Sequence, residues 1–81
     1  MIHILVVDDD AKLNKIVCAY LNDCGFEAKG VLDAQLAFEE MYNSLYDLIV
    51  SDIMMPQTDG FEFAKAVRQV NKHIPILFMS A

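Results

Sequence analysis

The sequence has little positive charge. It contains six lysine and arginine residues against twelve aspartate and glutamate residues, a formal net charge of −6. Surfaces that bind nucleic acids are basic, so this balance argues against a nucleic-acid contact made by these residues. An acidic chain is compatible with a cation site or with a basic protein partner.

Cysteine is also scarce, and long apolar runs are absent. Cys18 and Cys24 are the only cysteines. They do not form a metal-binding spacing such as CxxC, and on one predicted helix they lie on different faces. We interpret them as reduced thiols that fill space. No apolar stretch approaches the ~20 residues of a membrane span, and no signal peptide is apparent. We therefore expect a cytoplasmic location and no membrane partner.

The sequence also lacks internal repeats, low-complexity tracts and linkers, and 81 residues allow one domain. Short apolar runs alternate with helical patterns, which predicts the order β-α-β-α-β-α-β. The strands are expected at residues 2–7, 26–31, 47–51 and 76–80, and the helices from Asp9 or Asp10 to Gly25, after Asp33, and at residues 61–70. Alternation of this kind predicts an α/β fold, in which helices cover both faces of a parallel sheet.

Each predicted helix carries an apolar face. The positions expected to face the sheet are Leu13, Ile16, Val17, Tyr20 and Leu21 in the first helix, Ala34, Ala37, Phe38, Met41 and Tyr42 in the second, and Phe63, Val67 and Val70 in the third. With strand order 2-1-3-4, the first helix lies alone on its face. Four strands span about 19 Å, whereas one helix covers about 10 Å. Exposing ~400 Å² of apolar surface forgoes on the order of 10 kcal/mol. The chain is therefore expected to be a fragment of a longer domain or to cover this face with another chain.

Acidic residues follow two of the predicted strands. The first strand ends at Asp8 and Asp9, the third ends at Asp52, and the fourth ends with Ser80. In an open parallel sheet, sites lie at the carboxyl ends of the strands where the strand order reverses. That place falls between the first and third strands, so three carboxylates are expected to meet. Such a cluster needs either raised pKa values or a divalent cation, for which Mg²⁺ suits best. A carboxylate beside Mg²⁺ can act as a nucleophile towards phosphorus.

Each of these positions also has a plainer interpretation. Residues 8–10 can form a helix N-terminus stabilised by the macrodipole. Asp52 can be a turn residue at a strand end, and Ser80 a polar residue at a strand end. Asp59 fits a turn before Gly60 better than a metal ligand. The remaining candidates are His3 and His73 as surface or strand-edge residues, and Met54 and Met55 as core residues.

Three segments together resemble a known family. They are "ILVVDDD" at the first strand, "YDLIVSDIMMPQTDGFE" around the third, and "PILFMSA" at the fourth. In order and spacing they resemble the receiver domain of bacterial two-component response regulators. The resemblance implies a flavodoxin-like, three-layer, doubly wound parallel sheet with strand order 2-1-3-4. Because the family has a fifth strand and two further helices, residues 1–81 would be a truncated receiver domain. The lysine and the aromatic switch residue of the family's fifth strand have no counterpart here.

The resemblance also implies a role for each site residue. Asp52 would be the phosphoacceptor and a metal ligand. Asp9 would bind Mg²⁺ directly and Asp8 mainly through water, with the backbone carbonyl of Met54 as a further ligand. Ser80 would be the switch hydroxyl that moves towards the phosphoryl group.

The function implied is that of a phosphoacceptor signalling module rather than an enzyme. A sensor histidine kinase would phosphorylate it in the presence of Mg²⁺, and it would form the N-terminal part of a DNA-binding response regulator without itself contacting DNA. An alternative is a truncated receiver that forms a homodimer through the uncovered sheet face without phospho-signalling. A third hypothesis is a phosphotransfer enzyme for small substrates, but the sequence shows no substrate pocket, second acidic catalyst or basic phosphate clamp.

Overall fold

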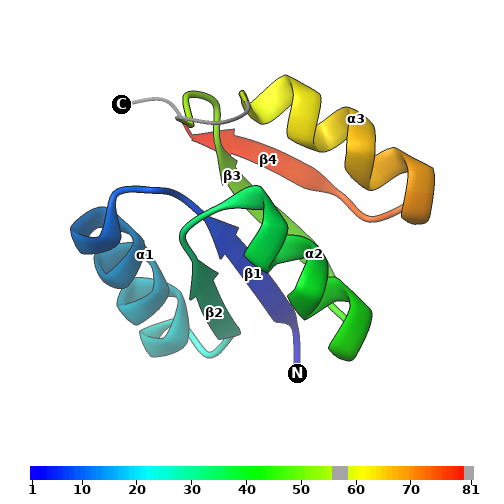
Figure 1. Ribbon diagram of the computed structural model, residues 1–81. Helices are drawn as coiled ribbons and strands as arrows, with labels where there is room; N and C mark the ends of the chain where they lie inside the picture. The colour runs from blue at the N-terminus through cyan, green and yellow to red at the C-terminus, as the bar shows by residue number, and fades with distance from the viewer. Residues whose placement is uncertain (56–58, 80–81) are drawn as a thin grey trace.

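The elements of the computed structural model alternate along the chain as the sequence predicts (Figure 1). The structure describes residues 1–55 and 59–79. The elements are β1 His3–Val7, α1 Ala11–Asp23, β2 Glu27–Val31, α2 Ala34–Asn43, β3 Leu48–Asp52, α3 Gly60–Val70 and β4 Ile76–Met79. Where the predicted boundaries fall on described residues, they differ from the observed ones by at most two residues.

The four strands form one parallel sheet with the order β2-β1-β3-β4. This confirms the α/β class, the strand order and the reversal between β1 and β3. The register places Val6 beside Gly30 on one side and beside Val50 on the other, and Val50 beside Leu77. Side chains of paired residues point to the same face, so this row of residues defines one face of the sheet.

Aspartate side chains begin all three helices. Asp10, Asp33 and Asp59 are N-caps whose carboxylates accept hydrogen bonds from the first turn. Gly25 follows α1 with φ of 96°, a conformation that glycine adopts without strain. Of the two predicted starts of the first helix, Asp9 and Asp10, the structure confirms Asp10 as the cap. Asp59 both precedes Gly60 and caps α3.

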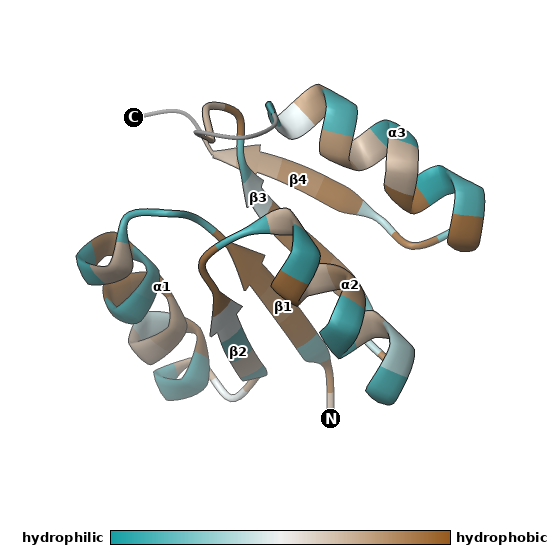
Figure 2. Cartoon of the chain, viewed as in Figure 1, coloured by the Kyte–Doolittle hydropathy of each residue, from teal (hydrophilic) through white to brown (hydrophobic). Residues whose placement is uncertain are grey.

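The main hydrophobic core lies between the sheet and the two helices α2 and α3. Leu5, Val7 and Ile49 project from the strands into a buried cluster with Ala37, Phe63 and Val67. The rings of Phe38 and Phe63 pack with their centroids 5.5 Å apart. Figure 2 shows how strongly hydrophobic β1 is compared with the edge strand β2.

The opposite face of the sheet is only partly covered. Ile4 and Val6 point to this face and are buried, because α1 packs against β1 and β2. At the far side of the same face Leu77 is 58% exposed, and Val50 is half-buried. Among the residues that the structure describes, none covers β4 fully on the sheet face that the sequence predicts to be uncovered.

The predicted apolar face of α1 is partly wrong. Ile16 and Tyr20 are exposed, whereas Asn14 is the residue that α1 buries. Helix α1 turns this polar side chain inward because its amide group donates to two backbone carbonyls. Cys18 lies one turn after Asn14 on α1, and its thiol contacts the Asn14 side chain. Both Cys18 and Cys24 are free thiols.

Two predicted core positions at the ends of α2 and α3 are also exposed. Tyr42 and Val70 lie in the last turns of these helices and line an open groove with Phe38, Met41 and Leu45. They face this groove rather than the sheet, which is why the amphipathic pattern overestimates their burial. In the part of the chain that the structure describes, no helix has the length and apolar character needed to cross a membrane.

Candidate functional site

The carboxyl ends of β1 and β3 bring three aspartates together. Asp8 and Asp9 directly follow β1, and Asp52 is the last residue of β3. Each offers an oxygen atom, and these atoms all lie within 4.8 Å of one another. The cluster predicted from the strand ends is thus present in the fold, across more than forty residues of sequence.

Asp8 is the buried member of this cluster, with 1% of its surface exposed. Its Oδ1 accepts a hydrogen bond of 2.9 Å from the amide of Asp10. Its Oδ2 is buried and has no hydrogen-bond partner among the described residues. Burial raises the pKa of the Asp8 carboxyl, and the nearby charges of Asp52 and Asp9 raise it further.

The backbone of Asp8 is held by two neighbours. Its N–H group donates to the carbonyl of Val31, at 3.2 Å. The buried side-chain amide of Asn14 donates to the carbonyl of Asp8 at 3.0 Å and to that of Val31 at 2.8 Å. Sequence reasoning missed Asn14. The available signal was a polar residue beside the apolar positions of the predicted helix.

Asp52 is half-buried, and its Oδ1 accepts a hydrogen bond of 3.3 Å from the amide of Met54. The Met54 side chain is exposed rather than part of the core, whereas Met55 packs against the core cluster. Gly60 is buried directly against the backbone of Asp52 and Ile53. The carbonyl of Met54 as a ligand stays a prediction, and Ser80 lies outside the described residues.

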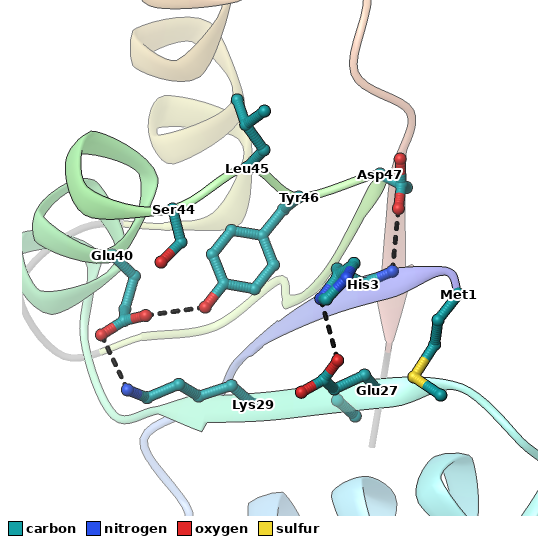
Figure 3. Close-up of a pocket in the computed structure, with 10 residues that line it drawn as sticks. Met1, His3, Glu27, Lys29, Glu40, Ser44, Leu45, Tyr46 and Asp47 are labelled. Atoms are coloured by element: carbon teal, nitrogen blue, oxygen red, sulfur yellow. Dashed lines mark hydrogen bonds and ion pairs between the residues drawn. The ribbon is translucent and has the colours of Figure 1, made fainter.

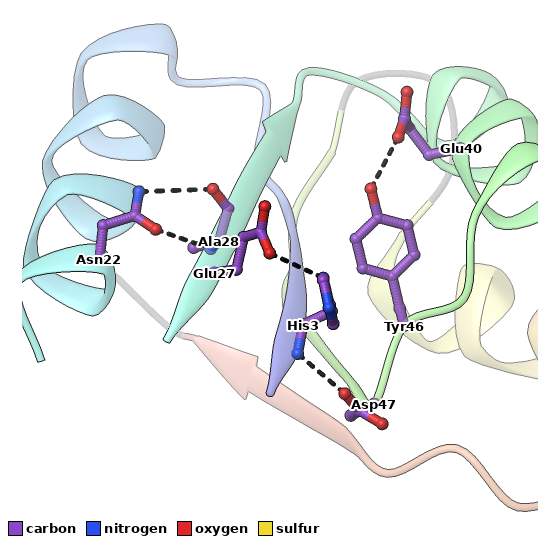
Figure 4. Close-up of polar contacts among 7 residues, drawn as sticks. All are labelled: His3, Asn22, Glu27, Ala28, Glu40, Tyr46 and Asp47. Atoms are coloured by element: carbon purple, nitrogen blue, oxygen red, sulfur yellow. Dashed lines mark hydrogen bonds and ion pairs between the residues drawn. The ribbon is translucent and has the colours of Figure 1, made fainter. Parts of the chain in front are cut away.

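The two histidines lie away from the acidic cluster. His3 begins β1 and pairs with Glu27 on the neighbouring strand, at 3.3 Å. Its backbone N–H donates to Asp47, at 2.8 Å. These contacts gather at the amino ends of the strands (Figure 4), and His73 is exposed after α3.

A pocket also lies at the amino ends of the strands, opposite the acidic cluster (Figure 3). Its wall contains Glu40, whose carboxylate accepts hydrogen bonds from Tyr46 at 2.7 Å and Lys29 at 2.9 Å. The hydrogen bonds from Tyr46 and Lys29 lower the pKa of Glu40. Burial raises the pKa of Tyr46, and the hydrogen bond to Glu40 raises it further. Because these polar groups satisfy one another, we place the candidate site at the aspartates.

The aspartate cluster fits a small hard cation. Mg²⁺ prefers oxygen ligands, often binds through one or two carboxylates, and keeps several waters. A cation at this position would give a counter-charge to the Asp8 carboxylate, whose Oδ2 has no partner within residues 1–55 and 59–79, and would offset the repulsion among three carboxylates. Asp8, Asp9 and Asp52 are therefore the residues that would hold Mg²⁺.

Replacing Asp8 with asparagine is expected to raise the free energy of unfolding of the metal-free chain by about 1 kcal/mol. A raised pKa means that the folded state binds the proton more tightly than the unfolded state. This contribution to stability is present at low pH and is lost as the pH rises through the folded pKa, so the ionised group disfavours folding at neutral pH. The amide introduced by Asp8→Asn would remove that charge and donate to the neighbouring carboxylates.

Urea unfolding with and without Mg²⁺ checks this prediction. Mg²⁺ at tenfold above its dissociation constant should stabilise the wild type by about 1.4 kcal/mol and the Asp8→Asn variant much less. Asp10→Asn is the matched control, because asparagine also caps helices and Asp10 is exposed. Equal behaviour of the two variants would contradict the assignment of Asp8.

Comparison with known proteins identifies the class of this α/β domain with its acidic cluster. The family model of the response regulator receiver domain matches residues 4–81. The chain belongs to this family, whose members are signalling modules.

Relatives of this chain include proteins named as transcriptional regulators. The transcriptional regulatory protein RprY of Bacteroides fragilis is 39% identical over 80 residues, which cover 99% of this chain and 34% of the relative. CiaR of Streptococcus pneumoniae is 36% identical over 81 residues, 100% of this chain and 36% of its own length. The chain thus spans about a third of the length of the curated relatives that it matches.

Solved structures share the fold. The chemotaxis protein CheY4 of Vibrio cholerae has a TM-score of 0.92 at 38% identity, over 96% of this chain and 67% of its own. The response regulator TrrA of Thermotoga maritima, in complex with Mg²⁺-BeF, has a TM-score of 0.93 at 31% identity, over 100% of this chain and 70% of its own.

Proposed function

We propose that this chain is a phosphoacceptor module in which Asp52 receives a phosphoryl group from a sensor histidine kinase. The observation that carries the proposal is the meeting of Asp8, Asp9 and Asp52 at the switch point of the sheet, with one buried carboxylate oxygen of Asp8 lacking a partner among the described residues. The cluster provides both an accessible carboxylate and a place for a divalent cation.

In the proposed reaction, a carboxylate oxygen of Asp52 attacks the phosphorus of a phosphohistidine. A new O–P bond forms, the P–N bond breaks, and the imidazole leaves with its electron pair, so that Asp52 becomes an acyl phosphate. Asp8 and Asp9 would hold the cation beside this carboxylate. A bound Mg²⁺ supplies positive charge that offsets the repulsion between the carboxylate and the phosphoryl oxygens.

The N–H group of Met54 orients the attacking side chain. It donates to Oδ1 of Asp52, which restricts the rotation of the carboxylate and leaves the other oxygen for attack. We propose that the Met54 carbonyl is a further metal ligand and that the Ser80 hydroxyl moves towards the phosphoryl group. The charge added, about −1.5 to −2, would bias a two-state element of the domain.

We further propose that residues 1–81 are a truncated receiver domain, the N-terminal part of a cytoplasmic response regulator that binds DNA through another domain. Support comes from relatives named as transcriptional regulators, of which this chain matches about a third. The acidic composition agrees with this division of roles, in which residues 1–81 contact the kinase and another domain contacts DNA.

A small-molecule phosphodonor tests the phosphoacceptor function. Incubation of the chain with acetyl phosphate and Mg²⁺ is expected to add one base-labile phosphoryl group, detected by intact-mass spectrometry. Omission of Mg²⁺ or addition of a chelator should abolish the product. No incorporation under any Mg²⁺ concentration would contradict the proposal.

A second candidate function is a homodimeric module that associates through the uncovered sheet face. The observation that favours it is Leu77, which is 58% exposed on a face where the β1 residues Ile4 and Val6 are buried. Sedimentation velocity at micromolar concentrations should then show a dimer, and Leu77→Lys should shift it to a monomer. A compact monomer at all concentrations would exclude this candidate.

A further inference from the structure

We propose that Asn14 is a positioning residue that sets the buried carboxylate of Asp8 for metal binding. This inference rests on the proposed function, because it concerns the same aspartate cluster. Asn14 lies on α1, is 5% exposed, and does not belong to the cluster itself. Its side chain reaches the strand ends from the helix that follows Asp8 and Asp9.

The side-chain amide of Asn14 links the carboxyl ends of β1 and β2 through hydrogen bonds from a single NH₂ group. Its Nδ2 donates at 3.0 Å to the carbonyl of Asp8 and at 2.8 Å to the carbonyl of Val31. Val31 is the last residue of β2, and its carbonyl also accepts the N–H of Asp8, at 3.2 Å. The peptide groups on both sides of the Asp8 Cα are therefore linked to the Val31 carbonyl, one directly and the other through the Asn14 amide.

These contacts, together with the hydrogen bond from the Asp10 amide to Oδ1, restrict Asp8 at three atoms. The carboxylate oxygen Oδ2 has no partner among the described residues, and the Asp8 carboxylate that carries it is a member of the cluster that would hold the cation. A buried carboxylate oxygen without a hydrogen-bond partner is energetically unfavourable. The Asp8 side chain therefore stays in this orientation only if the surrounding contacts prevent it from rotating towards solvent. Asn14 supplies the part of these contacts that comes from α1.

Gly30 and Cys18 lie next to the side-chain amide of Asn14. A Cβ atom at Gly30 would overlap Asn14 Oδ1 and would stand 3.0 Å from Cys18 Sγ, so only glycine leaves room for this side chain. The Cys18 thiol donates to Asn14 Oδ1, at 3.5 Å. Because a thiol is a weak donor, the two donations from Nδ2 to the carbonyls of Asp8 and Val31 are the contacts that fix the orientation of the amide.

Partners that orient metal ligands without touching the metal contribute strongly to affinity, and we assign this role to Asn14. Replacing Asn14 with leucine, a side chain of similar size without donors, is expected to raise the dissociation constant for divalent cations by about 10-fold. Gly30→Ala should have the same effect by a different route, because it keeps the amide but displaces it.

Mn²⁺ binding to the 81-residue chain, followed by electron paramagnetic resonance with Mg²⁺ as competitor, tests the inference. Each variant is measured at a temperature at which circular dichroism shows it to be folded. Val17→Ala is the control for general destabilisation, because Val17 is a half-buried apolar residue of the same helix. Cys18→Ala is the second control, because it leaves both donations from Nδ2 in place.

The expected result is weakened Mn²⁺ binding in Asn14→Leu and Gly30→Ala, with wild-type affinity in both controls. If the wild type binds Mn²⁺ at a site sensitive to Asp9→Asn, and Gly30→Ala or Asn14→Leu binds it equally well, the inference is wrong while the proposed metal site stands. If the wild type itself shows no such binding, the proposed metal site fails, and the role of Asn14 fails with it.

Discussion

The Asp52→Asn variant is expected to incorporate phosphate from acetyl phosphate at a rate at least about 100-fold below that of the wild type, because an amide oxygen is a poor nucleophile. The fold should persist. The substituted amide keeps an oxygen that can accept the Met54 N–H group, and asparagine is nearly isosteric with aspartate. Loss of one of three like charges also relieves repulsion in the cluster, since the Asp52 charge contributes to the raised pKa of Asp8.

Asp59→Asn is the matched control for this experiment. It makes the same chemical change in the loop that leads into α3, outside the three-aspartate cluster. Asparagine also caps helices, so the hydrogen bond to the amide of Glu62 can persist. The control should be phosphorylated as the wild type is. Equal incorporation in Asp52→Asn and Asp59→Asn would assign the phosphoacceptor to another residue.

The location of the aspartate cluster could be predicted from sequence because it depends on topology alone. Asp8 follows β1 and Asp52 ends β3, and these strands are neighbours in any parallel sheet with a reversal between the first and third strands. The helix starts at Asp10 and Asp33 were equally predictable, because capping is a local interaction between a side chain and the next turn.

The orientation of α1 could not be predicted in the same way. The amphipathic pattern places Ile16 and Tyr20 inside, yet they are exposed while the polar Asn14 is buried. Hydropathy assigns asparagine to the surface because it cannot anticipate that two strand carbonyls, from Asp8 and Val31, converge on one helix position. The residue missed is the one that contacts the backbone of the site, which agrees with the view that local rules fail at functional positions.

The sequence likewise could not show that Oδ2 of Asp8 has no hydrogen-bond partner among the described residues. The pattern "DDD" predicts repulsion, but not which oxygen is buried or which amide satisfies the other one. That distinction separates the roles of Asp8 and Asp10, because the Asp10 carboxylate accepts from the amides of Lys12 and Leu13. Within the described residues, two members of the acidic run therefore contribute to the cluster.

Gly60→Ala is expected to change the structure more than Asp52→Asn does. An added Cβ would lie 2.5 Å from the carbonyl oxygen of Asp52 and 2.8 Å from the Cα of Ile53, both backbone atoms that cannot rotate away. Gly60 also donates its N–H group to the carbonyl of Ile53, which holds the start of α3 against the end of β3. The collision should lower the free energy of unfolding by about 1–3 kcal/mol. It should also displace Asp52, so that the folded variant is phosphorylated more slowly.

Gly25→Ala separates the two effects of Gly60→Ala. Gly25 has φ of 96°, so alanine is strained there, but its Cβ would meet no atom within 4 Å, and the residue follows the far end of α1. Its strain should cost about 1–2 kcal/mol, comparable with the Gly60 variant. Urea unfolding measures stability, and the phosphorylation rate per folded molecule measures the site. If the Gly60 variant is destabilised yet phosphorylated as fast as Gly25→Ala, the close packing at Asp52 serves the fold alone, whereas a slower rate assigns to Gly60 the seating of the phosphoacceptor.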